Sequence, residues 1–152
     1  MSSGVERFRA AAGDGLQVRT FSESTRTADE AARAVGCEVG QIVKSLVFVA
    51  DGAPVLALVG DDRRLDVDAL RAALGAAEVR RADADEVRAA TGFSIGGVPP
   101  FGHRRPLRTV MDDGLHEHDV VWAAAGTPNH VFAIAPEELA TRAGAEVAAV
   151  GA

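Results

Sequence analysis

The single lysine of this 152-residue chain is the residue whose type and surroundings most suggest chemistry. Fifteen of the sixteen basic residues are arginine, and only Lys44, inside the apolar run 42–50, departs from this usage. A lysine in such a run either extends its ammonium past the apolar surface to solvent or points into a cleft. Because arginine supplies every other cation, we predict that Lys44 places a compact charge in a cleft, which the broad, planar guanidinium cannot do.

A glycine-containing loop could supply hydrogen-bond donors to the same cleft. Residues 96–103 read GGVPPFGH, in which Gly96 and Gly97 let backbone amides approach a ligand while Pro100 stiffens the chain. Amides that point at an oxygen gaining negative charge are among the largest contributions to acyl-transfer catalysis. The loop therefore predicts an oxyanion site, although its composition fits a tight surface loop equally well.

A second turn, GTPNH at residues 126–130, lies between two apolar strand-like runs. From this position Asn129 and His130 could face a pocket, because binding residues are often carried on loops that a rigid scaffold positions. The other histidines suggest less. His116 and His118 lack a third ligand at a spacing typical of metal sites, and we expect them to be exposed turn residues.

Three motifs of other enzyme classes fail or are doubtful. Val43-Lys44-Ser45 lacks the glycine that precedes the lysine of a phosphate loop, and no GxGxxG follows a strand. Residues 92–96 do match the GxSxG of serine hydrolases, with Ser94 as nucleophile and Asp119 and His130 following in the required order. That motif needs a strand before it and a helix after it, whereas here a helical pattern precedes it and prolines follow.

Composition limits the class of protein. The net charge of −6 argues against broad, sequence-independent binding of polyanions, so any nucleic acid must be contacted locally. No apolar stretch approaches the roughly 18 residues of a membrane span, and the first residues do not resemble a secretory signal. The single cysteine, Cys37, excludes an internal disulfide and a cysteine zinc cluster. We therefore expect a cytoplasmic protein.

Helical and strand patterns alternate without a linker or repeat, which predicts one α/β domain over residues 1–152. Thr27 and Glu30 form a capping-box pattern at a helix start, and Gly36 is placed to end that helix. We expect about six strands and five helices, with more hairpins than crossovers. The clearest helices are at 28–35, 66–74, 83–92 and 137–143, and the clearest strands at 42–50, 54–59, 107–111, 119–124 and 131–135.

Three segments together resemble the YbaK-like aminoacyl-tRNA deacylases, relatives of the editing domain of bacterial prolyl-tRNA synthetase. They are TADEAARAVGCEVGQIVKSLVF at 27–48, GFSIGGVPPFGH at 92–103 and VWAAAGTPNHVFAIAPEEL at 121–139. The resemblance implies a single compact α/β domain with a mixed, mostly antiparallel, barrel-like sheet and surrounding helices. It also implies hydrolysis of amino acids wrongly esterified to tRNA, in trans, with no metal and no other cofactor.

The resemblance assigns roles to individual residues. It makes Lys44 the active-site lysine and the Gly96-Gly97 loop the segment whose amides orient the substrate carbonyl. The other residues that match the family's substrate pocket are Thr27, Ser45, Pro100, Gly126, Asn129 and His130. Lys44 would hold the terminal phosphate of the tRNA or support the oxyanion. Because residue 45 varies within the family, the rejected amino acid stays open.

The implied partner is the acceptor end of a mischarged tRNA, with an aminoacyl-tRNA synthetase as a candidate second partner and with neither membrane nor DNA. A water would attack the ester, assisted by the free ribose hydroxyl, so no protein nucleophile is required. Two alternatives stay open. The pocket could belong to a non-catalytic adaptor that binds a small molecule, tRNA or a synthetase, or the chain could be a serine hydrolase that uses Ser94.

Overall fold

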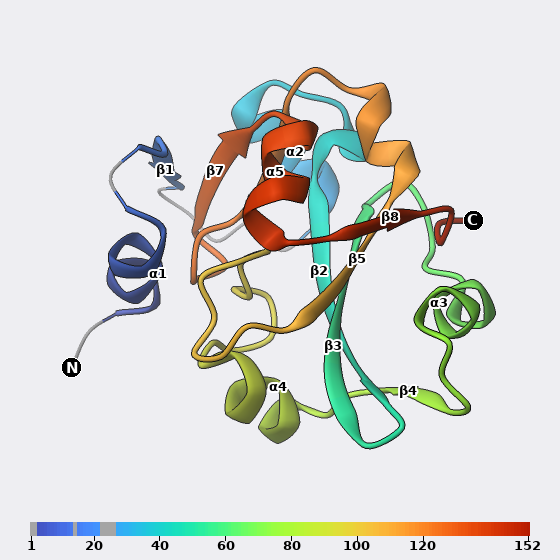
Figure 1. Ribbon diagram of the computed structural model, residues 1–152. Helices are drawn as coiled ribbons and strands as arrows, with labels where there is room; N and C mark the ends of the chain where they lie inside the picture. The colour runs from blue at the N-terminus through green and yellow to red at the C-terminus, as the bar shows by residue number, and fades with distance from the viewer. Residues whose placement is uncertain (1–2, 14, 22–26) are drawn as a thin grey trace.

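The structure is a computed structural model that describes residues 3–13, 15–21 and 27–152. A long antiparallel hairpin of β2 (Val43–Ala50) and β3 (Ala53–Gly60) runs through its centre (Figure 1). The hairpin turns at Asp51 and Gly52, whose φ angles are 49° and 84°. Positive φ at both positions is typical of a type I′ turn, which matches the twist of paired strands. The predicted hairpin is confirmed.

Within the described residues the strands form two separate sheets. Four of the six strand pairs are antiparallel, and only β3 with β5 and β5 with β8 are parallel. The five-stranded sheet has the order β4 (Val79–Arg81), β2, β3, β5 (Arg108–Asp112) and β8 (Glu146–Ala148), and the three-stranded sheet has the order β1 (Val18–Thr20), β7 (His130–Ile134) and β6 (Val121–Ala124).

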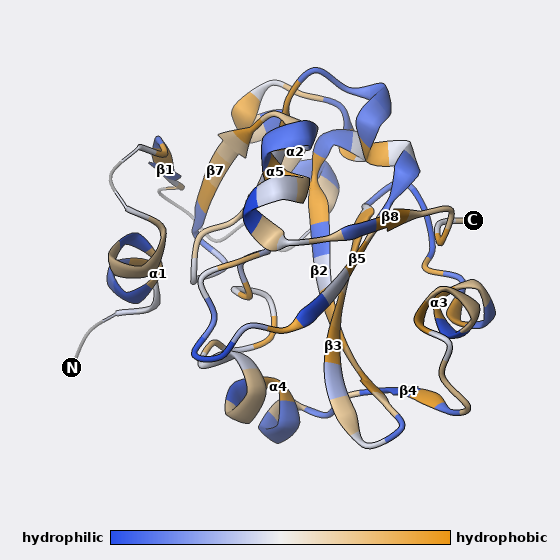
Figure 2. Ribbon diagram, viewed as in Figure 1, coloured by the Kyte–Doolittle hydropathy of each residue, from blue (hydrophilic) through white to orange (hydrophobic). Residues whose placement is uncertain are grey.

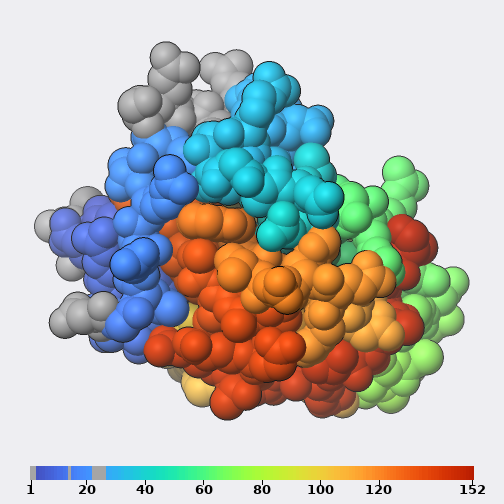
Figure 3. Space-filling model, turned by 90° about the horizontal axis from the view of Figure 1, so that it is seen from above, coloured from blue at the N-terminus to red at the C-terminus, as the bar shows by residue number. Residues whose placement is uncertain are grey.

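The expected α/β class and mostly antiparallel pairing are confirmed, whereas the barrel-like sheet is not supported. A barrel requires continuous hydrogen bonding around a closed ring of strands. In the part of the chain that the structure describes, the two sheets are joined by one isolated bridge, between Ile42 and Trp122. Figure 3 shows the segment around residue 40 lying against the segment around residue 120, which is where this bridge forms.

The helices begin and end largely as their capping residues predict. Thr27 Oγ1 accepts a hydrogen bond from the Glu30 amide at 3.1 Å, and Gly36 ends that helix with a φ of 77°. The helix at the chain start was not predicted, although Ser3 caps it in the same way. The helices are α1 (Gly4–Ala12), α2 (Ala28–Val35), α3 (Val67–Leu74), α4 (Ala84–Thr91) and α5 (Pro136–Ala143), with 3-10 turns η1 (Val39–Gln41) and η2 (Asp113–Glu117).

Both faces of the five-stranded sheet are covered by apolar side chains, and much of the β3 ribbon has the colour of hydrophobic residues in Figure 2. Helix α3 packs on one face through Leu70 and Leu74. The three-stranded sheet packs on the other face together with α1, α4 and α5, and Phe8 of α1 stacks on Phe132 of β7 with ring centres 5.0 Å apart. Successive residues of β2 therefore alternate between two different environments, because side chains along a strand alternate between faces.

The last residues of the chain pair with the segment that follows β3. Arg64 and Ala152 exchange two backbone hydrogen bonds, and the amides of Val150 and Gly151 donate to Oδ1 of the buried Asp112. The Arg63 guanidinium lies 3.7 Å from the other oxygen of that carboxylate. These contacts fix the residue 61–65 segment beside the end of β3. No helix in the described part of the chain is long and apolar enough to span a membrane.

Candidate active site

A pocket of about 670 Å³ opens between the two sheets, beside the first half of β2. Its walls are mostly apolar and come from α2, β2, β4, β6 and the loop that follows α4. The lining includes Thr27, Lys44, Ser45, Asp61, Arg81, Ile95, Gly96, Trp122 and Pro128. The pocket thus gathers four of the nine residues predicted for the site, namely Thr27, Lys44, Ser45 and Gly96.

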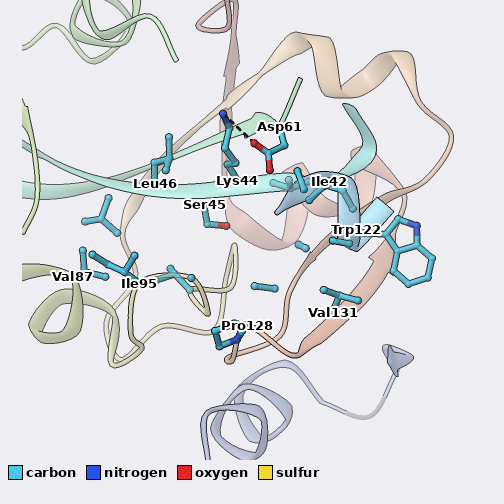
Figure 4. Close-up of a pocket in the computed structure, with 18 of the residues that line it drawn as sticks. Ile42, Lys44, Ser45, Leu46, Asp61, Val87, Ile95, Trp122, Pro128 and Val131 are labelled. Atoms are coloured by element: carbon cyan, nitrogen blue, oxygen red, sulfur yellow. Dashed lines mark ion pairs between the residues drawn. The ribbon is translucent and has the colours of Figure 1, made fainter. Parts of the chain in front are cut away.

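Lys44 lies at the rim of this pocket, half-buried, with its side chain 29% exposed. Its ammonium donates a hydrogen bond to the Arg63 carbonyl at 2.8 Å and lies 3.4 Å from the Asp61 carboxylate. In Figure 4 the Lys44 side chain leaves β2 on the side of Asp61, whereas Ser45 points toward Pro128 and Ile95. The lysine is therefore held in one place by short polar contacts rather than extended freely into solvent.

Ser45 presents a polar side chain to the apolar interior of the pocket. It lies between Val43 and Val47, both buried on the same face of β2. The Ser45 Oγ atom is buried and has no hydrogen-bond partner among the described residues. A buried hydroxyl without a partner costs free energy, which a ligand that donates or accepts a hydrogen bond there would recover. Ser45 is thus placed to contact an occupant of the pocket.

The two loop glycines have different environments. Gly96 lines the pocket with a φ of 92°, in the region that favours glycine, and no described backbone carbonyl accepts its amide. Gly97 does not line the pocket, and its amide donates to the Ser94 carbonyl at 3.0 Å. A Cβ at residue 97 would lie 2.7 Å from the Thr127 Cα atom. Gly96 could orient a substrate carbonyl, whereas Gly97 lets the loop pack against the turn behind it.

The remaining predicted residues lie behind the pocket wall. Pro100 is buried, and Gly126 packs its backbone directly on Gly4 of α1. The backbone N–H of Asn129 donates to Thr127 Oγ1 at 3.2 Å, and this hydroxyl also forms a hydrogen bond with Nδ1 of His130. None of Pro100, Gly126, Asn129 and His130 lines the cavity in this structure. Gly126, Asn129 and His130 belong to the turn that carries Pro128, which does line it.

Sequence patterns gave no sign of three residues that line the pocket. Asp61 follows β3 and pairs with Lys44. Arg81 of β4 is exposed, and its guanidinium lies 5.9 Å from the centre of the Phe48 ring. Trp122 lines the pocket beside Ile42, under the Arg19 guanidinium. Only the pairing of distant strands brings these residues together, so no local spacing reveals them.

Ser94 does not occupy a nucleophile elbow. It follows α4 rather than a strand, no helix follows it before Pro99, and it is exposed outside the pocket lining. Ser94→Ala should therefore keep most of the hydrolysis expected from the sequence, because its contact to Gly97 uses the backbone carbonyl, which alanine retains. Steady-state rates of the two proteins, with circular dichroism as the control for folding, check this. Loss of nearly all activity in a folded variant would restore the serine-hydrolase alternative.

The Cys37 thiol is also a poor nucleophile. Burial and the nearby Glu38 carboxylate raise its pKa, so little thiolate is present near neutral pH. Within the described ranges no three His, Cys, Asp or Glu side chains are arranged to hold a metal ion.

His103 anchors the loop that carries Gly96. Its Nε2 atom lies 2.6 Å from the Pro99 carbonyl, and burial lowers its pKa, an effect that the hydrogen bond to Pro99 only partly opposes. The folded protein therefore takes up this proton less readily than the unfolded chain, whose histidine pKa is about 6.5. The stability that neutral His103 contributes is fully present above about pH 6.5. It is lost progressively as the pH falls below that value toward the lower pKa of the folded state.

This linkage gives a testable pH dependence. His103→Gln keeps a side-chain N–H that can donate to Pro99 but does not titrate, so its stability should fall less than that of the wild type between pH 7.5 and 5. Urea unfolding at several pH values measures the difference, and the other histidines cancel because both proteins contain them. Parallel pH curves would show that His103 is not the titrating group.

Comparisons with known proteins agree with this geometry. Residues 22–141 match the aminoacyl-tRNA editing domain, so the chain belongs to that family. A candidate Cys-tRNA(Pro)/Cys-tRNA(Cys) deacylase, EbsC of Enterococcus faecalis, is 28% identical over 120 residues, which cover 78% of this chain and 73% of the relative. The proline-tRNA ligase of Citrifermentans bemidjiense is 29% identical over 138 residues, 86% of this chain but 24% of the ligase.

Solved structures are also similar over nearly the whole length of both chains, and one of them bears directly on function. It is the crystal structure of a candidate trans-editing enzyme for prolyl-tRNA synthetase, with a TM-score of 0.94 and 46% identity, covering 100% of this chain and 99% of that one. The resemblance to the YbaK-like deacylases is thereby confirmed. The match to part of a proline-tRNA ligase agrees with the expected relationship to the editing domain of bacterial prolyl-tRNA synthetase.

Proposed function

We propose that this protein hydrolyses the ester of mischarged aminoacyl-tRNA, acting in trans as an editing deacylase. The observation that carries the proposal is the pocket, found in a chain that belongs to the editing family. The pocket is apolar enough for a small aminoacyl group, and Lys44 and Arg81 supply cations at its rim. The similarity to a candidate trans-editing enzyme and to a candidate deacylase supports the same activity. Residues 1–152 would act as one domain, in the cytoplasm, where charged tRNA is used.

The proposed reaction needs no protein nucleophile. A water oxygen attacks the ester carbonyl carbon, the carbon–oxygen bond to the ribose breaks, and the departing ribose oxygen takes up a proton. The free neighbouring ribose hydroxyl assists the water, and the products are the amino acid and the tRNA with its terminal hydroxyl restored. The Gly96 amide would donate to the carbonyl oxygen as it gains negative charge, which lowers the barrier most in a site shielded from water.

Lys44 would bind the terminal phosphate of the tRNA rather than the carbonyl. Its ammonium lies on the Asp61 side of β2, away from the side on which Ser45 faces the pocket (Figure 4). Arg81 lines the same pocket and supplies a second cation, so the two positive charges outnumber the single carboxylate of Asp61. A local excess of positive charge allows a chain with a net charge of −6 to hold one acceptor end.

The remaining residues would act through the shape of the pocket. Thr27 and Ser45 would contact the aminoacyl group, while Gly97, Pro100, Gly126, Asn129 and His130 would hold the loop and turn that close the pocket. We propose the acceptor end as the main tRNA contact and an aminoacyl-tRNA synthetase as a further partner. No DNA or membrane contact is part of this proposal.

A panel of mischarged tRNAs tests the function. Release of radiolabelled amino acid should be fastest for one small residue, with tRNA for proline carrying alanine, cysteine or serine as the first substrates to examine. Correctly charged prolyl-tRNA is the control and should be hydrolysed more slowly. Binding without release of any amino acid would instead support the non-catalytic adaptor.

A further inference from the structure

The edge of β2 next to the pocket has unpaired backbone groups. In the hairpin with β3, the Asp61 backbone amide donates to the Ile42 carbonyl. Because hydrogen-bonded positions alternate along an antiparallel pair, residues 42, 44 and 46 direct their N–H and C=O groups toward β3. The alternate residues must direct their N–H and C=O groups to the opposite edge. The bond from the Ala82 amide to the Val47 carbonyl, at 3.1 Å, confirms this direction.

Ser45 lies in a gap along this edge. On one side of the gap Ile42 bridges to Trp122, and on the other Val47 accepts from Ala82. Ser45 is opposite Leu58 of β3 on its other side, but between these two points no described residue bonds the Ser45 backbone on the edge away from β3, and Ser45 lines the pocket. One N–H and one C=O therefore point from the strand edge into the cavity. Unpaired strand edges bind extended main chains, with the backbone supplying affinity and side-chain pockets supplying specificity.

We propose that the Ser45 backbone binds the aminoacyl group of the substrate as if it were one residue of an added antiparallel strand. An α-amino ester carries its nitrogen and its carbonyl on one carbon, the arrangement found in a chain residue. Its ammonium donates to the Ser45 carbonyl while the Ser45 amide donates to the ester carbonyl, as in a hydrogen-bonded strand pair. The amide is then a second donor beside Gly96. This inference rests on the proposed deacylation.

The pairing fixes where the amino-acid side chain lies. Residues directly opposite each other in an antiparallel pair place their side chains on the same face, about 5 Å apart. An L-aminoacyl side chain would lie beside the unpartnered Ser45 hydroxyl, on the face that carries Val43 and Val47. The side chain of a D-aminoacyl group would instead point to the face of Lys44 and Leu46. The pairing therefore selects both handedness and size.

Proline at residue 45 tests the amide. It removes the N–H but breaks no bond to β3, because that N–H points to the free edge, where proline is tolerated in strands. Ser45→Ala is the matched control, since it removes the hydroxyl and keeps the amide. We expect the single-turnover rate of Ser45→Pro to be at least tenfold below that of Ser45→Ala, with melting temperatures within a few degrees. Equal rates in two folded variants would overturn the proposal.

Substrate handedness tests the same proposal without any variant. The amino acid released fastest from the tRNA panel is compared as its L and D esters on the same tRNA, with the wild-type protein. The L ester should be hydrolysed at least tenfold faster, and equal rates would contradict the pairing. If the wild type releases no amino acid from any mischarged tRNA, the proposed function itself fails. If the wild type is active but hydrolyses the L and D esters at equal rates, only the strand-pairing inference fails.

Discussion

Replacement of Lys44 by alanine should leave the fold intact and reduce deacylation about 100-fold, because an ester whose terminal phosphate is no longer held loses the near-contact geometry that the reaction needs. The ammonium is held between the Arg63 carbonyl and the Asp61 carboxylate, so its position is fixed before substrate arrives. Single-turnover rates on the best mischarged tRNA measure the effect. Arg71→Ala is the control, since it removes a cation from an exposed ion pair with Asp68 on α3.

Lys44→Arg separates a specific role from simple charge. The guanidinium keeps the positive charge but is planar and broader, so it cannot occupy the same space between Arg63 and Asp61. We expect a loss close to that of the alanine variant. An active arginine variant would contradict the need for a compact charge, and a fully active alanine variant would contradict the proposed mechanism. A large drop in melting temperature with activity retained would indicate a structural lysine.

Replacement of Gly97 by alanine should also reduce deacylation by about 100-fold, through displacement of the loop. The new Cβ would lie 2.7 Å from the Thr127 Cα atom and 2.8 Å from the Gly126 carbonyl oxygen. Both are backbone atoms that cannot move aside independently, so the loop must shift and carry Gly96 out of position. A shift of this size is costly in catalysis because reacting groups need near-contact geometry. We also expect a lower melting temperature.

Gly96→Ala is the matched comparison on the neighbouring residue. Its Cβ would meet only the Pro128 side chain, at an ordinary contact distance of 3.6 Å, although a φ of 92° strains any residue with a side chain. Its activity should fall less than that of Gly97→Ala, and its fold should persist. Wild-type rates in both variants would show that this loop does not orient the carbonyl.

Local signals in the sequence were sufficient for the helices and the central hairpin. The capping residues Thr27, Asp66 and Asp83 each bond the amide three residues ahead, and the apolar runs of β2 and β3 pair as expected. The three-residue strands β1, β4 and β8 were missed because they contain charged or polar residues and exist only through their partners. Ser3 and Glu6 carry the same local capping signal at the start of α1.

Some residues of the candidate site could be predicted from the sequence, whereas others depend on the tertiary fold. Lys44 and the glycine loop stood out because their residue types were unusual for their surroundings. Asp61 and Arg81 did not, because charged residues near strand ends are ordinary and only the order of strands brings both to the same pocket as Lys44. The bare edge at Ser45 could not be predicted either. It depends on β4 pairing with only the second half of β2, which no local pattern specifies.

The chain end has an energetic connection to a lysine that it never touches. Residues 150–152 hold the segment around Arg63 through Asp112 and a backbone pair, and the Arg63 carbonyl in turn accepts from Lys44. Trimming these last residues, or pulling on them with a fused partner, would loosen the acceptor that orients the ammonium. The deacylation rate would then respond to changes at the terminus while the walls of the pocket stay intact.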